Sequence, residues 1–348
     1  MKNYQIKNYL LVFITGFMVQ SLTSQETEED FIRIAGKIAS ASDDIQKVWP
    51  DFWSEDEPFL FMKHDSIVHV YNVINPEGDY EKIKAEKLPQ SLKDKAFRKK
   101  SYLPEYVDLK HTFPGQYKVG KVEVYALEPK GSDDFRKIDF YLHESFHYFQ
   151  RPNWEKTVGD TVSIRMGQPI LDTIVQVKNE KFINLLNLER NLLAQSLETS
   201  SEDSIKENLK KIMIIRERRD AMIPARAKDL MERYIRREGS ATYTGLQASA
   251  MANNFPKDSV YAEIKQGLLK PFSEFPSFPM EEQRFLRWPH YAIGASIALL
   301  MDKIEIPGWK KELAEGKTFY QILQENLPIS KKERNTLEKE VTRNIKSF

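Results

Sequence analysis

The stretch that most constrains this chain is His143-Glu144-Ser-Phe-His147, which places two histidines four residues apart. On an α-helix, side chains at this spacing lie one turn apart on the same face, so both imidazoles can reach one metal ion. The glutamate beside the first histidine can act as a base toward a metal-bound water. The pattern therefore predicts a helix over this stretch, with a metal site on one of its faces.

The composition narrows the ligands and partners that such a site can have. The 348 residues are enough for one or two domains, and the formal net charge of +1 gives no reason to expect a nucleic acid or an acidic membrane as partner. The chain has no cysteine, which excludes disulfides and thiolate ligands, so a metal must be held by histidine, aspartate or glutamate. The sequence contains neither a nucleotide-binding glycine loop nor a G-x-S-x-G motif.

Residues 1–24 have the layout of a secretory signal peptide. Lys2 and Lys7 precede an apolar run, and small polar residues then lead into an acidic stretch. We expect cleavage after Ser24, with Ser21 as the alternative. The run is too short for a stable membrane anchor, and a short membrane-attached N-terminal helix is the competing interpretation. We therefore expect an exported chain, in a bacterial periplasm or outside the cell, with no stable membrane anchor after cleavage.

The mature chain is expected to consist of a mixed α/β half and a helical half. The mixed half covers residues 25–130. It has a helical pattern over 28–49, β-forming residues that predict two short strands over 59–73, and an alternating pattern that predicts one strand over 117–127. The lysine-rich segment 80–100 is expected to be a solvated surface.

Residues 131–348 form the helical half, which carries the histidine pair. The helix with that pair follows a turn and N-cap signal at 130–134 and ends near Arg151-Pro152. The expected fold class is therefore α+β and predominantly helical. Further helical patterns cover 169–200, 204–222, 224–251, 289–302, 308–326 and 330–345, and a Pro/Phe-rich loop covers 271–279.

Glu238 is the best candidate for the third ligand that such a zinc site needs beside an open position for water. It lies in the middle of an apolar stripe on the 224–251 helix. A carboxylate that points into a core is costly unless it is paired or binds a metal. The competing interpretation is a buried ion pair with one of the nearby arginines, which are Arg233, Arg236 and Arg237.

These residues resemble the motifs of the gluzincin metallopeptidases, and in particular of their peptidase MA-like branch. The chain has His143-Glu144-x-x-His147 followed by Glu238-Gly239-x-Ala241-x-Tyr243, and the Gly/Ala-rich helix that begins at Tyr291 is similar to one that packs behind the site in such enzymes. The resemblance covers roughly residues 119–302, in patches. It implies a zincin-like metallopeptidase fold in which Zn²⁺ is bound by His143, His147 and Glu238.

The chain departs from the family pattern in three ways. The interval between His147 and Glu238 is much longer than in thermolysin or the aminopeptidases. No Gly-x-Met-Glu-Asn-type motif precedes the histidine pair, so aminopeptidase activity is not supported. Thr242 stands at the position where thermolysin-like enzymes place an aspartate behind the metal.

The resemblance also implies roles around the metal. Glu144 takes a proton from the zinc-bound water and gives it to the leaving amine. Tyr291 is the first choice for the donor that stabilises the oxyanion, and His290 and Tyr243 are alternatives. The competing interpretation of Tyr291 is a core tyrosine whose hydroxyl is satisfied by a structural hydrogen bond. Asp139, one turn before His143, could orient that imidazole, but an exposed helix carboxylate is the favoured interpretation.

Three other parts of the sequence bear on the expected site. An edge strand at 119–127 could pair with an extended substrate, as in similar enzymes. The 271–279 loop either lines a cleft or packs over a core. No metal role is expected for His64, His69 or His111.

The expected function is that of an exported zinc metallopeptidase, a hydrolase acting on a peptide or protein substrate. The alternative is a non-enzymatic exported helical binding protein with a structural or inactive zinc site. A zinc hydrolase of another amide or ester is a third interpretation. The sequence leaves open the substrate, endo- or exopeptidase action and the oligomeric state.

Overall fold

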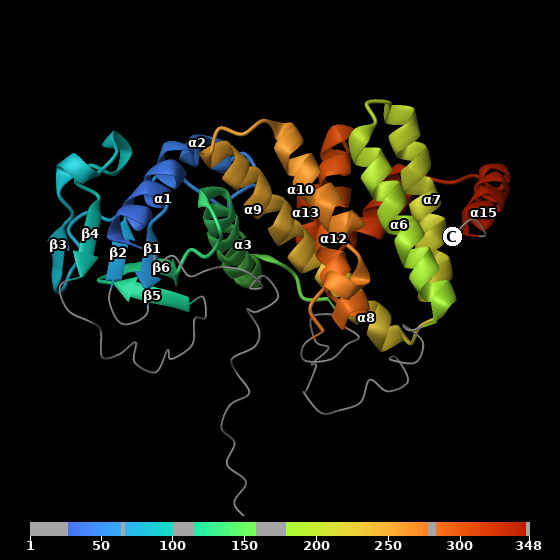
Figure 1. The fold of residues 1–348 in the computed structure, drawn as a ribbon, viewed down its shortest axis with the longest axis horizontal. Helices are drawn as coiled ribbons and strands as arrows, with labels where there is room; N and C mark the ends of the chain where they lie inside the picture. The colour runs from blue at the N-terminus through green and yellow to red at the C-terminus, as the bar shows by residue number, and fades with distance from the viewer. Residues whose placement is uncertain (1–26, 64–66, 100–114, 158–178, 278–282, 346–348) are drawn as a thin grey trace, which may run out of the picture. The chain divides into compact units, whose positions relative to one another are not determined.

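A computed structural model describes residues 27–63, 67–99, 115–157, 179–277 and 283–345 (Figure 1). The expected signal peptide over residues 1–24 lies outside the described residues. The described chain is α+β and predominantly helical, as the sequence predicts. None of the described helices combines the length and the apolarity that a membrane-spanning segment needs.

Contacts divide the chain into two compact units. The first contains the residues up to Phe149 together with Thr244–Pro256, and the second contains Gln150–Tyr243 and Lys257–Phe348. This division differs from the boundary expected near residue 130, because most of the helix that carries the histidine pair groups with the sheet. We call the two parts the sheet unit and the helical unit.

The sheet unit is built on six strands in the order β3-β4-β2-β1-β6-β5. β1 pairs with β6 in parallel, and the other neighbours are antiparallel. The two strands predicted over 59–73 are confirmed as β1 and β2. The strands are β1 (Phe59–Lys63), β2 (Ile67–Tyr71), β3 (Tyr80–Lys82), β4 (Ala96–Lys99), β5 (Gly115–Val119) and β6 (Val122–Leu127).

Two predictions for this unit are wrong. The segment 80–100 is not only solvated surface, because it contains the edge pair β3 and β4, whose short runs lack a clear alternating pattern. The single strand predicted over 117–127 is a hairpin, β5 and β6, which turns at Gly120 with a φ of +63°. Val119 therefore lies opposite Val122 across the hairpin, so the two side chains share one face of the sheet although one sequence number is odd and the other even.

The two faces of the sheet have different apolar partners. On one face, Phe61 of β1 contacts Phe31 and Tyr141 edge to face, with ring centroids 5.6 and 4.8 Å apart. Phe31 belongs to α1 (Glu28–Ser40) and Tyr141 belongs to α3 (Asp134–Asn153), so these two helices cover that face (Figure 1). The other face carries a separate buried cluster that consists of Leu60, Val68, Val70, Val73, Val119, Val124 and Ala126.

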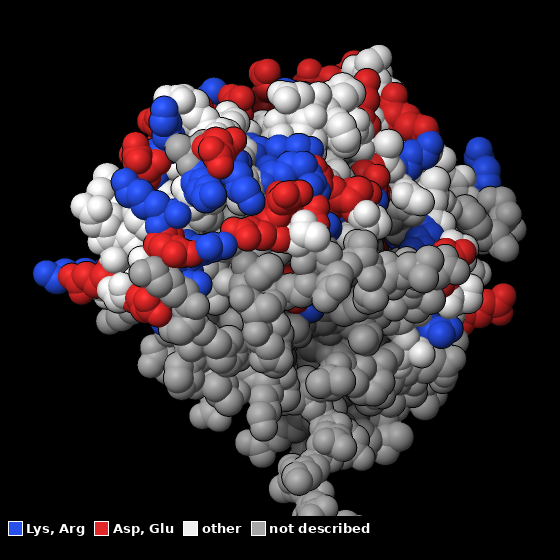
Figure 2. Space-filling model, turned by 60° about the vertical axis from the view of Figure 1, so that its left-hand side comes forward, with Lys and Arg blue, Asp and Glu red and all other residues white. Residues whose placement is uncertain are grey.

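The predicted helix over 28–49 is confirmed in most of its length, as α1 followed by α2 (Ser42–Ile45). A capping box of Thr27 and Asp30 begins α1. On the outer side, Arg33 and Lys37 of α1 form ion pairs with Asp134, the first residue of α3, at 2.7 Å each. Figure 2 shows basic and acidic side chains interspersed on the face that it presents, rather than separated into fields of one sign.

Helix α3 begins soon after strand β6, which fixes where the histidine pair lies. The Asp133 carboxylate accepts a hydrogen bond from the Arg136 amide at 2.9 Å, which caps the helix as predicted. The buried Tyr141 hydroxyl donates to the Tyr125 carbonyl oxygen of β6 at 3.0 Å. The helix ends at Asn153, close to the end predicted near Arg151-Pro152, and Pro152 lies in its last turn.

The helical unit is organised around α12 (Trp288–Lys303), which is buried on nearly all sides. Helices α6 (Glu180–Glu198) and α7 (Glu202–Asp220) form a hairpin and lie side by side in Figure 1. The helix α10 (Lys257–Leu269) is not predicted by the sequence analysis, and the helix predicted over 308–326 is two helices. The others are α11 (Gln283–Leu286), α13 (Trp309–Ala314), α14 (Phe319–Asn326) and α15 (Lys331–Ile345).

The single helix predicted over 224–251 is continuous but contains a π turn. It runs through α8 (Ala225–Arg233), the π turn η5 (Tyr234–Glu238) and α9 (Gly239–Ala252). At the end of the π turn the Gly239 amide donates to the carbonyl of Tyr234, five residues back. A π turn inserts one residue into the helix and is common at functional sites.

A buried ion pair links α6 and α7. The side chains of Glu189 and Arg219 are both 0% exposed, and the guanidinium donates to one carboxylate oxygen. The Tyr320 hydroxyl of α14 donates to the other oxygen. Removing one member of a buried pair leaves an uncompensated charge, so this contact is sensitive to single substitutions.

We expect Arg219→Met to destabilise the protein by about 3–5 kcal/mol, because it leaves the Glu189 carboxylate buried without its cation. The double variant Glu189→Leu/Arg219→Met should be closer to wild type. The matched control is Arg334→Met, whose ion pair with Glu217 is 37% and 40% exposed and contributes about 1 kcal/mol or less. Urea denaturation followed by circular dichroism measures all three. If Arg219→Met lowered the free energy of unfolding no more than the control does, the Glu189–Arg219 pair would not be a contact that is sensitive to single substitutions.

Candidate metal centre

Helix α3 carries the histidine pair next to residues that are fully buried. Ile138, Leu142 and Phe146 are fully buried, whereas His143, Glu144 and His147 are each partly exposed. The two imidazole rings lie edge to face, with centroids 4.8 Å apart. The predicted one-turn spacing is therefore confirmed, and both rings are accessible from one side of the helix.

Gly245 of α9 lies in close contact with α3 at the first histidine. A Cβ atom at Gly245 would fall 2.6 Å from the Asp139 carboxylate and 3.1 Å from the Cβ atom of His143. Only a glycine allows this approach. Glu238 lies seven residues earlier on the same continuous helix, about two turns or 10 Å away along the axis.

A second contact between α3 and the helix that carries Glu238 is made by Gln150, which lies one turn after His147 on α3. The fully buried Gln150 amide donates to the Arg237 carbonyl oxygen at 3.1 Å and to the Ser240 hydroxyl at 2.9 Å. These groups flank Glu238 in sequence. The side chain therefore provides a hydrogen-bond partner for the irregular backbone of the π turn and ties that turn to α3.

His143, His147 and Glu238 come together as the sequence analysis proposes. Each offers one ligand atom, and these atoms all lie within 4.8 Å of one another. The ligand atoms of a tetrahedral zinc site are roughly 3.4 Å apart, so small side-chain rotations would bring the three to one ion. The donor set of two imidazoles and one carboxylate is that of catalytic zinc sites. The residues present thus fit a zinc ion.

The competing interpretation of Glu238 involves nearby arginines, and the structure describes the partners of one of them. The buried Arg236 guanidinium donates to the carbonyl oxygens of Leu313, Ala314 and Glu155, at 2.8 to 3.3 Å. Its charge is thus directed toward α13 and the segment after α3.

Helix α12 crosses the π turn with backbone in direct contact. A Cβ atom at Gly239 would fall 2.5 Å from the Cα atom of Gly294, and a Cβ atom at Gly294 would overlap the carbonyl oxygen of Ile235. Tyr291 lies one turn before Gly294. This crossing brings the first turn of α12 close to Glu238.

Arg287 is the residue of this site that the sequence analysis missed. Its guanidinium donates to the Tyr291 hydroxyl oxygen from Nε at 3.2 Å and from Nη2 at 2.9 Å. Burial raises the pKa of Tyr291 well above its usual range, and the Glu238 carboxylate raises it further while Arg287 opposes the change. The spacing of arginine and tyrosine four apart at a helix start is the signal that could have identified the pair.

The alternative oxyanion donors have other surroundings. His290 is fully buried, and neither ring nitrogen has a hydrogen-bond partner among the described residues. Burial, together with the charges of Arg219 and Arg216, holds the pKa of His290 well below its usual range. The Tyr243 hydroxyl hydrogen-bonds to the Asp302 carboxylate at 2.5 Å.

The remaining histidines have no metal cluster around them in the part of the chain that is described. His69 is a core residue whose Nδ1 lies 2.9 Å from the Tyr71 hydroxyl, and burial lowers its pKa to about 4. His64 and His111 lie outside the described residues.

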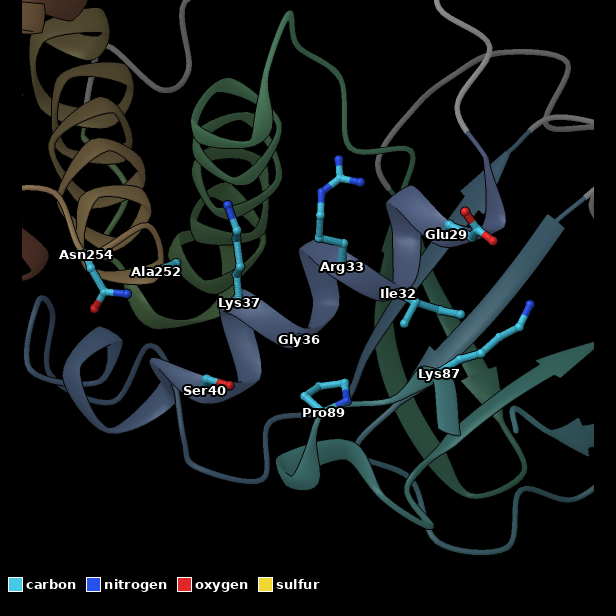
Figure 3. Close-up of a pocket in the computed structure, with 10 residues that line it drawn as sticks. All are labelled: Glu29, Ile32, Arg33, Gly36, Lys37, Ser40, Lys87, Pro89, Ala252 and Asn254. Carbon is cyan, nitrogen blue, oxygen red and sulfur yellow. The ribbon is translucent and has the colours of Figure 1, made fainter. Parts of the chain in front are cut away.

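A pocket of about 580 Å³ lies in the sheet unit against α1 and contains none of the predicted site residues. Figure 3 shows Arg33 and Lys37 pointing from α1 toward α3, where both pair with Asp134. His143 lies nine residues after Asp134, about 13 Å along the helix axis. The pocket is therefore separate from the metal centre.

Comparison with known proteins gives no relative. The chain matches no protein-family model, no curated protein and no solved structure.

Gly245→Ala should weaken zinc binding roughly 10- to 100-fold, the range seen for changes behind metal ligands, because the added methyl group pushes α9 away from Asp139 and His143. It should also cost about 1–3 kcal/mol of stability. Calorimetric zinc titration and thermal unfolding measure the two effects. Gln247→Ala in the same helix is the control and should change neither. Unchanged zinc affinity in Gly245→Ala would show that this contact does not position the ligands.

Proposed function

We propose that this chain is an exported zinc-dependent metallopeptidase with a zincin-like fold. The observation that carries the proposal is the convergence of His143, His147 and Glu238, with Glu144 adjoining the first ligand. The strand that leads into the histidine helix, and the later helix that brings the glutamate, support the fold assignment. The sequence of residues 1–24 supports export to the periplasm or the cell exterior.

The side chains have distinct tasks in peptide-bond hydrolysis. A zinc ion held by the three ligands would supply a Lewis acid that polarises the scissile carbonyl. Glu144 accepts a proton from the attacking water and returns it to the leaving amine. Tyr291 donates a hydrogen bond to the oxyanion that develops on the carbonyl.

The non-enzymatic alternative is an exported binding protein in which the zinc is structural or inactive. A site that only holds zinc does not need a carboxylate beside the first histidine. The presence of a partly exposed Glu144 at that position favours hydrolysis.

The mature chain from Gln25 should contain about one zinc ion per molecule, and His143→Ala and Glu238→Ala should both lose it. Elemental mass spectrometry of the purified proteins measures this. Glu202→Ala, which removes an exposed carboxylate from α7, is the control and should keep its zinc. Loss in His143→Ala but not in Glu238→Ala would move the third ligand elsewhere. A wild-type chain without zinc after reconstitution would refute the site.

Glu144→Gln should keep its zinc but lower peptide hydrolysis by about 10²- to 10⁴-fold, the contribution expected of a general base. A library of quenched fluorescent peptides provides the assay, and Glu180→Gln is the matched surface control. Hydrolysis that survives the Glu144 substitution would contradict the mechanism. Zinc without any Glu144-dependent hydrolysis of peptides, other amides or esters would support the binding-protein alternative.

A further inference from the structure

The guanidinium of Arg287 is fixed in one orientation at the start of α12. Arg287 is the residue before the helix, and its side chain reaches forward one turn to the Tyr291 hydroxyl. Its guanidinium carbon lies 4.6 Å from the ring centroid of Trp288 and 5.5 Å from that of Tyr234. Aromatic rings at these distances hold an arginine plane in place and attract its charge.

The two hydrogen bonds constrain what the Tyr291 hydroxyl can do. A phenol oxygen has two acceptor positions and one proton. Arg287 donates to that oxygen from both Nε and Nη2. A guanidinium carries only donors, so the Tyr291 oxygen is the acceptor in this contact. The hydroxyl proton is therefore directed away from Arg287 and serves other groups as a donor.

A donor is what a developing oxyanion requires. A phenol that could accept as well as donate could also be oriented by a solvent molecule with its proton away from the carbonyl. Catalysis gains most from donors that are oriented before the reaction begins, because no reorganisation is then needed in the transition state.

We propose that Arg287 is a positioning residue that keeps Tyr291 oriented as an oxyanion donor. The inference rests on the proposed peptidase function and extends it. Arg287 does not touch the reacting atoms in this role. Its effect passes through Tyr291, so removing either side chain removes the same interaction.

The test is a double-mutant cycle on the mature, zinc-loaded chain, with Tyr291→Phe, Arg287→Met and the double variant. Rates are measured with the best peptide of the fluorescent library. Affinities are measured by calorimetry for a phosphinic pseudodipeptide with two benzyl side chains, whose tetrahedral oxygens imitate the oxyanion. Acetohydroxamate, which binds the metal alone, is the reference ligand. Zinc content and thermal unfolding are recorded for every variant.

We expect each single variant to lower kcat by about 10²- to 10³-fold with little change in KM, the loss known for one oxyanion donor. Phosphinic affinity should fall while acetohydroxamate affinity and zinc content stay constant. The double variant should be no worse than Tyr291→Phe. Arg287→Lys, which offers a single point donor, should fall between wild type and Arg287→Met. The surface control Arg334→Met should behave as wild type.

Losses that multiply in the double variant would overturn the inference, because Arg287 would then act independently of Tyr291. A loss in Arg287→Met that follows zinc content or melting temperature would overturn it too, since the arginine would then be structural; Arg287→Lys provides the folded comparison. Failure of the proposed function is distinguishable, because it would appear in the wild type as absent Glu144-dependent hydrolysis.

Discussion

The candidate site depends on close backbone packing at three glycines. Gly245 meets α3 at Asp139 and His143, and Gly239 and Gly294 meet where the π turn crosses α12. Helices with ordinary side chains at their contact are 8–10 Å apart. Glycine removes the side chain that keeps them at this distance, which lets α9 approach the histidine helix at Gly245 and lets α12 approach the π turn at Gly239. The three ligand residues supply the donor atoms of the candidate site, and the glycines allow close packing of the helices around it.

The π turn changes the direction of side chains along the helix that carries Glu238. One inserted residue rotates the side chains of the segment before it by about 100° around the helix axis relative to those of the segment after it. Glu238 is the last residue of the turn, so its direction is set by an irregular backbone rather than by the stripe that precedes it. Such a turn leaves carbonyl groups without their regular partners. Gln150 donates to the carbonyl oxygen of Arg237, which belongs to the turn, so the same side chain also joins the turn to the histidine helix.

Sequence reasoning recovers the parts of this protein that depend on local periodicity. The histidine helix and the strands β1 and β2 follow from spacing, and the grouping of the histidines with Glu238 was expected from the apolar stripe and the resemblance to the gluzincins. The apolar stripe that identified Glu238 was nevertheless a regular helical stripe, and the π turn interrupts it. Arg287 was missed because the aromatic surroundings of its guanidinium are contributed partly by Tyr234, more than fifty positions away in the sequence. The pair β3 and β4 was missed because edge strands this short are defined by the ladder they join.

Helix α12 links the packing of the helical unit to the direction of the Tyr291 side chain, the proposed oxyanion donor. His290 and Tyr291 are adjacent, so their side chains point about 100° apart around the axis. The first faces the buried charges of α6 and α7, among which Arg219 is the strongest influence on it, and the second lies close enough to Glu238 for that carboxylate to affect its pKa. Because α12 is buried on nearly every side, it cannot turn to adjust one residue without displacing the other. A substitution in the Glu189–Arg219 pair that displaced His290 would therefore also displace Tyr291, although neither charged residue belongs to the candidate metal centre.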